Sequence, residues 1–306
     1  MSGVGRITVW PVRDPLVSAV IPAFNAAEYI GQAIQSVKDQ TYASLECIVV
    51  DDGSTDGTRE LVSRYSDVIL IRQVNAGVSA ARNAGVREAS GDLVAFLDAD
   101  DVWLPSKIAK QVELHGSGAL FSYTGLQVVR ADLSPIEEIF PPEPDRALRN
   151  TLLVERPVVS VGQTGMLARH LFDRLGGFDE QLSTSADCDF ACRALLETDG
   201  APVRETLVLY RLHEAQLHLR PEVTLMDMEL VFDKMWADTR LPRSIARAKR
   251  RARANVYVSV AAAYLHNGAR ANFIRHATSA AFLRPDRFAA AVGKFVQRRL
   301  LRVGAP

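Results

Sequence analysis

The chain has few cysteines, few aromatic residues and no long apolar run. Its 306 residues include 7% aromatic residues and three cysteines, Cys47, Cys188 and Cys192. These cysteines are too few for the disulfide framework of a small secreted protein, and no His or Cys cluster beside them favours zinc. The longest apolar stretch near the end, residues 256–265, is too short to span a bilayer, and the start has no signal-peptide pattern. We therefore expect a cytoplasmic location, with peripheral contact at the inner membrane face as an open alternative.

The formal charge is zero, but it is unevenly distributed along the chain. Residues 241–306 contain fourteen Lys and Arg residues and one acid, Asp286, so they carry +13 and the remainder carries −13. Such asymmetry indicates a tail that meets an anionic surface, either a membrane or the acidic body of the same chain. Nucleic acid is disfavoured, because the tail lacks interleaved exposed aromatic residues and any recognisable binding motif.

Apolar runs alternate with helical periodicity over the first hundred residues. The sequence predicts strands at residues 17–22, 45–50, 68–71 and 93–97, and helices at 26–40, 56–65 and 77–89. It predicts later strands at 119–130, 158–167 and 203–212, helices at 171–177 and 187–197, and only helices from 221 onward. Strands that alternate with helices indicate an α/β fold with a mostly parallel sheet covered on both faces.

Polar residues follow each of the first four predicted strands. They are Asn25, Asp51 with Asp52, Asn75, and Asp98 with Asp100. Any one of them could simply cap a helix. Ligands of such sheets bind beyond the carboxyl ends of the strands, so the four positions together predict one binding crevice.

The stretch LVAFLDADDVW, residues 93–103, brings three aspartates together after an apolar strand. Like charges this close are costly to bury unless a cation compensates them. Two carboxylates two residues apart suit Mg²⁺ or Mn²⁺, which can also hold substrate phosphates. The spacing does not fit an EF-hand, and the chain has no GxxxxGK[ST] loop and no GxGxxG after the first strand.

The ordered motifs of the chain resemble those of the family 2 glycosyltransferases, which have a GT-A fold. The matching segments are VSAVIPAFNAAEYI (17–30), SVKDQTYASLECIVVDDGSTDGT (36–58), NAGVSAARNAG (75–85) and GDLVAFLDADDVWLPSKIAKQV (91–112), with weaker matches at LGGFDEQL, SADCDFACR and YRLHEAQLH. The resemblance implies a Rossmann-like GT-A domain over residues 1–220. Residues 221–306 would be a basic, helical extension.

The resemblance also implies a nucleotide-sugar site. Its residues would be Pro22, Ala23, Asn25, Asp52, Asn75, Arg82, Asn83, Asp98 and Ala99. Asp52 would accept a hydrogen bond from the base, uracil or thymine. Asp98-Ala99-Asp100 matches the DxD motif, in which Asp100 and Asp98 would hold the metal.

Asp187 matches the family's catalytic base, although Ala186 stands where an acidic neighbour is usual. Without the motif, Asp187 would read as a carboxylate at a helix N-terminus. His213 matches a histidine that lies late in the sequence of the family's fold and that could ligate the metal. The alternative is that it only packs or forms a hydrogen bond. Asp189 and Arg193, four residues apart, are expected to form an ion pair.

These observations predict an inverting, metal-dependent glycosyltransferase. It would move a sugar from a UDP or dTDP donor to a hydroxyl of a saccharide or lipid-linked acceptor, in cell-surface glycan synthesis. A catalytically silent nucleotide-sugar-binding module and a sugar nucleotidyltransferase are the alternatives. Because many relatives act on lipid-linked acceptors, the resemblance favours an anionic membrane as the partner of the tail. The sequence leaves the sugar, the linkage and the oligomeric state open.

Overall fold

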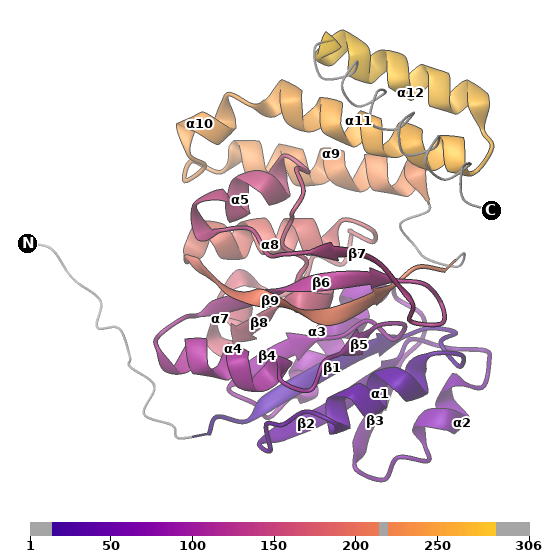
Figure 1. Cartoon of the computed structure of the whole chain (residues 1–306), viewed down its shortest axis with the longest axis vertical. Coiled ribbons are helices and arrows are strands. Elements are labelled where there is room, and N and C mark those ends of the chain that lie inside the picture. Colours follow the sequence, from indigo (N-terminus) through magenta and orange to yellow (C-terminus); the bar gives the residue numbers. More distant parts are fainter. Residues whose placement is uncertain (1–13, 214–219, 286–306) are drawn as a thin grey trace, which may run out of the picture.

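The computed structural model describes residues 14–213 and 220–285 (Figure 1). Its strands are β1 (Val17–Ala23), β2 (Leu45–Asp51), β3 (Val68–Arg72), β4 (Leu93–Phe96), β5 (Val102–Trp103), β6 (Phe121–Val129), β7 (Pro135–Ile139), β8 (Met166–Ala168) and β9 (Gly200–Arg211). The helices of its first two thirds are α1 (Ile30–Lys38), α2 (Thr58–Val62), α3 (Val78–Glu88), α4 (Lys107–Gly116), α5 (Pro144–Leu152), α6 (Val161–Thr164), α7 (Arg169–Leu175) and α8 (Ala186–Glu197). The helices that follow are α9 (Pro221–Ala237), α10 (Arg243–Ala246), α11 (Lys249–His266) and α12 (Arg270–Leu283).

One sheet runs through the body of the molecule in the order β3-β2-β1-β4-β8-β6-β9-β5, and β7 pairs with β6. The strands β3, β2, β1 and β4 are parallel, as predicted. β8 is antiparallel to β4, and β5 is antiparallel to β9. The carboxyl ends of β1, β2 and β4 therefore meet at one edge, which is where the polar residues were expected.

Burial on both faces explains the uninterrupted apolar strands. Every residue of β1 and of β4 is buried, as expected for strands covered by helices on two sides. The helix α3 lies very close to β1. A Cβ atom on Gly85 would stand 2.3 Å from Val20 Cγ1, so only glycine permits this approach. The packing fixes α3, and with it Arg82, against the sheet.

The prediction of a strand at residues 158–167 was wrong. The chain forms the short helix α6 and then the three-residue strand β8. The N–H of Thr164 donates to the carbonyl of Ser160, and the N–H of Gly165 donates to that of Val161. Apolar periodicity cannot separate a short buried helix from a buried strand, and here a helical turn wins.

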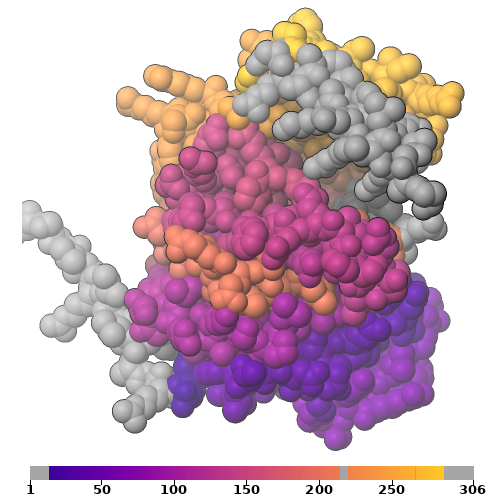
Figure 2. Space-filling model, viewed as in Figure 1, coloured from indigo at the N-terminus to yellow at the C-terminus, as the bar shows by residue number. Residues whose placement is uncertain are grey.

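The helices α9 to α12 form a layer at one end of the molecule, coloured orange to yellow in Figures 1 and 2. Val231 and Phe232 of α9 belong to the same hydrophobic core as Phe190 of α8 and the central strands. None of the helices in the described residues is both long and apolar enough to span a bilayer. The end of the basic tail, including Phe288, Phe295 and Arg298 to Arg302, lies outside the described residues.

Candidate active site

Each of the three aspartates after β4 meets a basic residue of the protein. The pairs are Asp98 with Arg82, Asp100 with His213, and Asp101 with Arg211. Asp101 is 1% exposed, and its Oδ1 atom accepts the backbone N–H of Arg211 at 2.9 Å. Its side chain therefore connects the end of β4 to β9. Arg82 therefore compensates the charge of Asp98 directly, whereas Asp101 is held by a backbone N–H group.

Arg82 joins two carboxylates that lie far apart in the sequence. Its Nη2 atom donates to Asp98 Oδ1 at 2.6 Å, and its Nη1 atom donates to Asp187 Oδ1 at 2.7 Å. The side chain is 4% exposed and its Cζ atom lies 5.1 Å from the centre of the Phe178 ring. Burial alone would lower the pKa of Arg82, but Asp187 and Asp98 raise it above its ordinary value. Arg82 is thus a permanent positive charge between them.

The environment also disturbs the ionisation of Asp98. Burial raises its pKa to about 6, and the negative charges of Asp187 and Asp100 act in the same direction. The guanidinium of Arg82 opposes them in part. Gln163 Nε2 donates to Asp98 Oδ2 at 2.6 Å, so both oxygens of Asp98 already accept a hydrogen bond.

Asp187 lies in the first turn of α8, at the end of the helix that favours a negative charge. Its Oδ2 atom accepts the hydroxyl of Ser160 and the backbone N–H of Gly162, each at 3.1 Å. Its Oδ1 atom accepts only Arg82 among the described residues, and a carboxylate oxygen has two lone pairs. Oδ1 therefore keeps an acceptor position for a substrate hydroxyl.

Ser160, Gly162 and Gln163 also belong to the site, although none of them was among the predicted site residues. All three lie at or within α6, the segment predicted as a strand. A Cβ atom on Gly162 would stand 2.2 Å from Arg82 Nη2 and 2.7 Å from Asp187 Oδ2. Only glycine leaves room for the Arg82–Asp187 pair. Gly162 and Gly165 of this segment were the one signal in the sequence that could have indicated this close packing.

The loop before α8 is held by a residue of the C-terminal helices. Asp227 of α9 is 5% exposed. Its Oδ2 atom accepts the backbone N–H groups of Ser183 at 2.9 Å and Ser185 at 3.1 Å, and the hydroxyl of Thr184 at 3.2 Å. Ser185 is the residue that precedes α8. The carboxylate thereby fixes the entry to the helix that carries Asp187.

Asp100 and His213 fit a divalent cation better than Asp98 does. Asp100 Oδ2 and His213 Nε2 lie 2.8 Å apart, and both side chains are partly exposed. Two ligands of one metal ion typically stand about 3 Å apart, and carboxylate oxygen with imidazole nitrogen is a donor set that Mn²⁺ accepts. No group of three or more His, Cys, Asp or Glu side chains in the described part of the chain could hold a metal. The remaining coordination positions would fall to ligand oxygens and water.

The predicted base-binding residues form a tight loop beside β2. Asp52 is 3% exposed, and its carboxylate accepts the side-chain amide of Gln73 and the backbone N–H groups of Ala76 and Gly77. Asn75 is exposed in the same loop. The carboxylate of Asp52 thus organises residues 75–77, and its predicted contact with a nucleobase stays a prediction.

The other predicted donor-site residues divide into three groups. Pro22, Ala23 and Ala99 are buried, so only their backbones can face a ligand. Asn25 is exposed at the end of β1, where its Oδ1 atom accepts the N–H of Thr55 at 2.9 Å. Asn83 contacts the backbone of Phe178 and does not face Arg82 or Asp98.

Asn83 exchanges two hydrogen bonds with the backbone of Phe178, at 2.8 and 2.9 Å. It therefore ties α3 to the loop before α8 and is not brought together with Arg82 in the site. The predicted ion pair of Asp189 and Arg193 is present at 2.7 Å.

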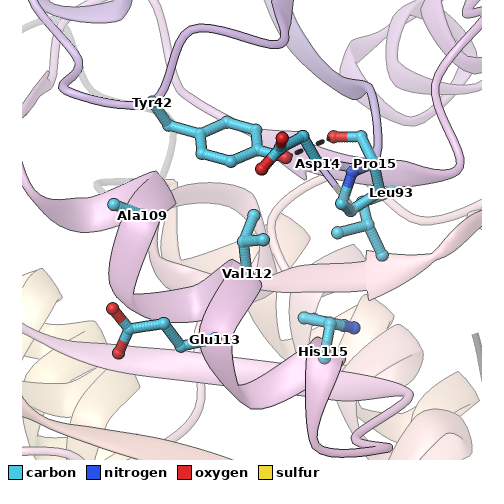
Figure 3. A pocket seen from close by; sticks show the side chains of 9 residues that line it. Asp14, Pro15, Tyr42, Leu93, Ala109, Val112, Glu113 and His115 are labelled. Atoms are coloured by element: carbon cyan, nitrogen blue, oxygen red, sulfur yellow. Dashed lines mark hydrogen bonds between the residues drawn. The ribbon is translucent and has the colours of Figure 1, made fainter. Parts of the chain in front are cut away.

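A separate cavity of about 360 Å³ lies at the opposite edge of the sheet (Figure 3). Pro15, just before β1, and Leu93, the first residue of β4, line it, so it faces the amino ends of the strands. The Tyr42 hydroxyl donates to the Pro15 carbonyl at 2.7 Å beside it. This cavity is remote from Arg82 and takes no part in the site.

Comparison with known proteins extends the resemblance. A family model described as "Glycosyl transferase family 2" matches residues 18–171. TuaG of Bacillus subtilis, provisionally named a teichuronic acid biosynthesis glycosyltransferase, is 39% identical over 149 residues, which cover 45% of this chain and 59% of TuaG. WfgD of Escherichia coli, named a UDP-Glc:alpha-D-GlcNAc-diphosphoundecaprenol beta-1,3-glucosyltransferase, is 41% identical over 33% of this chain and 41% of its own length. The matched region thus spans less than two thirds of either relative.

Solved structures share the fold. TarS of S. aureus in complex with UDP-GlcNAc superposes with a TM-score of 0.64 at 18% identity, over 87% of this chain and 91% of that one. The mannosyltransferase PcManGT of Pyrobaculum calidifontis, in complex with GDP-Man and Mn²⁺, superposes with a TM-score of 0.60 at 21% identity, over 95% and 82%. At these identities the likeness concerns the fold.

Proposed function

Because the chain belongs to glycosyltransferase family 2, we propose that it transfers a sugar from a nucleotide-diphospho-sugar to an acceptor hydroxyl, with inversion at the anomeric carbon. The observation that carries this proposal is the Asp98–Arg82–Asp187 bridge at the carboxyl edge of the sheet. It places a candidate base beside the DxD segment. That is the arrangement that an in-line displacement at a bound donor needs.

Asp187 acts as the general base. Its Oδ2 atom is held by Ser160 and Gly162, and its Oδ1 atom has an acceptor position left for the hydroxyl proton. Arg82 orients the carboxylate through its hydrogen bond to Oδ1, as a positioned base requires. As the acceptor oxygen attacks the anomeric carbon, the sugar–phosphate bond breaks and the proton passes to Asp187.

Asp100 and His213 would hold a divalent cation together with the donor diphosphate. When bound, the cation would supply Lewis-acid stabilisation of the charge on the departing nucleoside diphosphate. The imidazole in this donor set favours Mn²⁺ over Mg²⁺, which prefers oxygen ligands alone. In this proposal Asp98 serves the donor through Arg82 and Gln163, and it does not need to ligate the ion itself.

The names of the relatives support a UDP-sugar donor and a cell-surface acceptor. WfgD is named for UDP-Glc and a diphosphoundecaprenol acceptor, and TarS was solved with UDP and UDP-GlcNAc. We propose residues 1–220 as the region that binds donor and acceptor. Residues 221–306 would bring the protein, from the cytoplasm, to an anionic membrane that carries a lipid-linked acceptor.

A thermal-shift series tests the donor site. UDP, dTDP and GDP are each added with and without Mn²⁺. A nucleotide at a hundred times its Kd adds about 2.7 kcal/mol of stability, which raises the Tm of a chain this size by roughly 5 °C or more. We expect the rise with UDP and Mn²⁺ together, and its loss in Asp100→Ala. A nucleotide-independent Tm would refute the donor site.

A turnover assay separates the proposal from a silent binding module. Ala186, where the family resemblance implies an acidic neighbour of the base, is the observation behind that alternative, and it is 1% exposed. Asp187→Asn keeps the size of the side chain and removes the base. We expect this variant to keep the UDP-dependent rise in Tm and to lose transfer of sugar to acceptor. Equal turnover in Asp187→Asn and the wild type would assign the proton to another group.

A further inference from the structure

A second cavity lies within the C-terminal helical layer. Its volume is about 350 Å³, and it is an open pocket bordered by α10, the start of α11 and the end of α12. Four arginines and a hydroxyl define its chemistry: Ser244, Arg247, Arg250, Arg251 and Arg284. No carboxylate in the described part of the chain lines it. The cavity therefore concentrates positive charge in a space large enough for a phosphate or a diphosphate group.

Two of the four arginines of this cavity, Arg247 and Arg250, have no acidic partner within the described part of the chain. Arg251 pairs with Glu155, outside the cavity lining. Arg247 and Arg250 are exposed, and neither forms an ion pair with any acid in residues 14–213 or 220–285. Guanidinium groups that share one cavity repel one another unless an anion joins them. The lining of this cavity therefore has an excess of positive charge.

The helix that begins at the cavity adds to the imbalance. The 18-residue helix α11 opens with Lys249, Arg250 and Arg251, and its first turn contains no acidic residue. The N-terminus of a helix carries a partial positive charge and favours acidic side chains. Three cations at that end are therefore locally unfavourable. A bound anion would offset both the helix terminus and the arginines.

We infer that this cavity binds a phosphate group, carried by a lipid headgroup or free in solution. Arginine presents paired N–H donors that match phosphate oxygens, and the Ser244 hydroxyl adds a further donor. Phe282, beside the cavity residue Leu283, is 83% exposed. An exposed aromatic ring next to a phosphate site fits the interface of a bilayer.

The cavity is distinct from the donor site. The helix α9, 17 residues long, separates α10 from the chain that follows His213. At 1.5 Å per residue this helix spans about 25 Å. Figure 1 shows α10 at the far end of α9 from its first residue. The inference deepens the proposed membrane contact and rests on that proposal for the lipid arm only, since phosphate binding here is independent of sugar transfer.

Two binding measurements on the full chain test the site. The first is co-sedimentation with vesicles of phosphatidylcholine, with and without phosphatidylglycerol, and the second is thermal shift with pyrophosphate at constant ionic strength. The variant is Arg247→Gln with Arg250→Gln. Its matched control is Arg64→Gln with Arg87→Gln, two exposed arginines of the catalytic region with the same change in charge.

We expect the wild type to bind the anionic vesicles well and the neutral vesicles poorly. The cavity variant should bind them roughly thirty-fold more weakly, because each basic residue near an anionic surface contributes a factor of about five. The control should stay within about two-fold. A rise in Tm with pyrophosphate that only the cavity variant loses, without vesicle binding, supports the site and assigns free phosphate as its source.

Equal losses in the cavity variant and the control would overturn the inference, as would binding of neither probe by the wild type. The UDP-dependent rise in Tm, measured on the same variants, keeps the two proposals apart. If the UDP-dependent rise in Tm is present while phosphate binding is absent, only the proposed phosphate site is rejected. If it is absent while phosphate binding is present, only the donor site is rejected.

Discussion

Replacing Gly162 by alanine should disable the site while leaving the sheet in place. The added Cβ atom would lie 2.2 Å from Arg82 Nη2, 2.9 Å from Arg82 Cζ and 2.7 Å from Asp187 Oδ2. Cβ atoms essentially never approach heavy atoms within 3.0 Å. Arg82 cannot simply swing away, because it is buried and held by both Asp98 and Asp187. One of the two ion pairs must therefore open.

The size of the effect follows from these distances. An atom at 2.2 Å must retreat by more than 1 Å to reach ordinary contact. A displacement of about 1 Å in a catalytic group costs roughly 100-fold in rate. Overpacking of this kind costs about 1–3 kcal/mol of folding free energy, which lowers the Tm of a chain this size by a few degrees. We expect turnover to fall far more than stability.

The assay compares Gly162→Ala with Gly116→Ala. A Cβ atom on Gly116, the last residue of α4, meets no heavy atom within 4 Å. This control changes the backbone entropy in the same way and touches nothing. Turnover, donor KM and Tm are measured for both. If Gly162→Ala transfers sugar as fast as Gly116→Ala, then the fit of α6 around Arg82 and Asp187 has no part in the reaction, and the reasoning fails.

Three further predictions concern other parts of the fold. Asp227→Ala removes three hydrogen bonds to the loop before α8, so kcat should fall on the order of ten-fold while the KM for donor stays within about two-fold; Asp227→Asn, which keeps an acceptor oxygen, should recover part of the loss. Burial lowers the pKa of His115 to about 4, so as the pH falls this residue is protonated in the unfolded chain before it is protonated in the folded one. Stability is therefore lost as pH falls from 6.5 toward 4, and in urea unfolding between pH 7 and 4.5 the wild type should lose about 2.5 kcal/mol more than His115→Gln. Burial raises the pKa of Cys47 to about 12, so maleimide should modify this thiol only after the protein unfolds.

Local pattern was sufficient to predict the parallel half of the sheet. The strands β1, β2 and β4 are apolar runs bounded by polar residues, and burial on two faces makes such runs unmistakable. Because parallel strands end at one edge, the position of Asp98 and Asp100 followed directly. The family resemblance then named Asp187, which no local pattern distinguishes from an ordinary residue of a helix N-terminus.

The partners of the aspartates could not be predicted, because they come from distant parts of the chain. Asp187 lies 105 residues from Arg82, and His213 lies 113 residues from Asp100. Periodicity concerns neighbours within a turn or a strand, so it contains no information on such pairs. The segment of α6 was mistaken for a strand because a short buried apolar run has no distinguishing period. Gly162 contributes an N–H group that every residue except proline possesses.

The C-terminal helices support the candidate active site as well as forming a basic surface. Asp227 of α9 fixes the residues that enter α8. Lys234 of α9 lies 3.7 Å from Asp189 of α8. Val231 and Phe232 extend the core of the sheet into this layer. Contact between the layer and a phosphate-bearing surface would therefore act on a helix that contacts α8 and the loop before it directly. Because Asp187 sits in the first turn of α8, a ligand that shifts α9 would reach the base through one carboxylate and three hydrogen bonds.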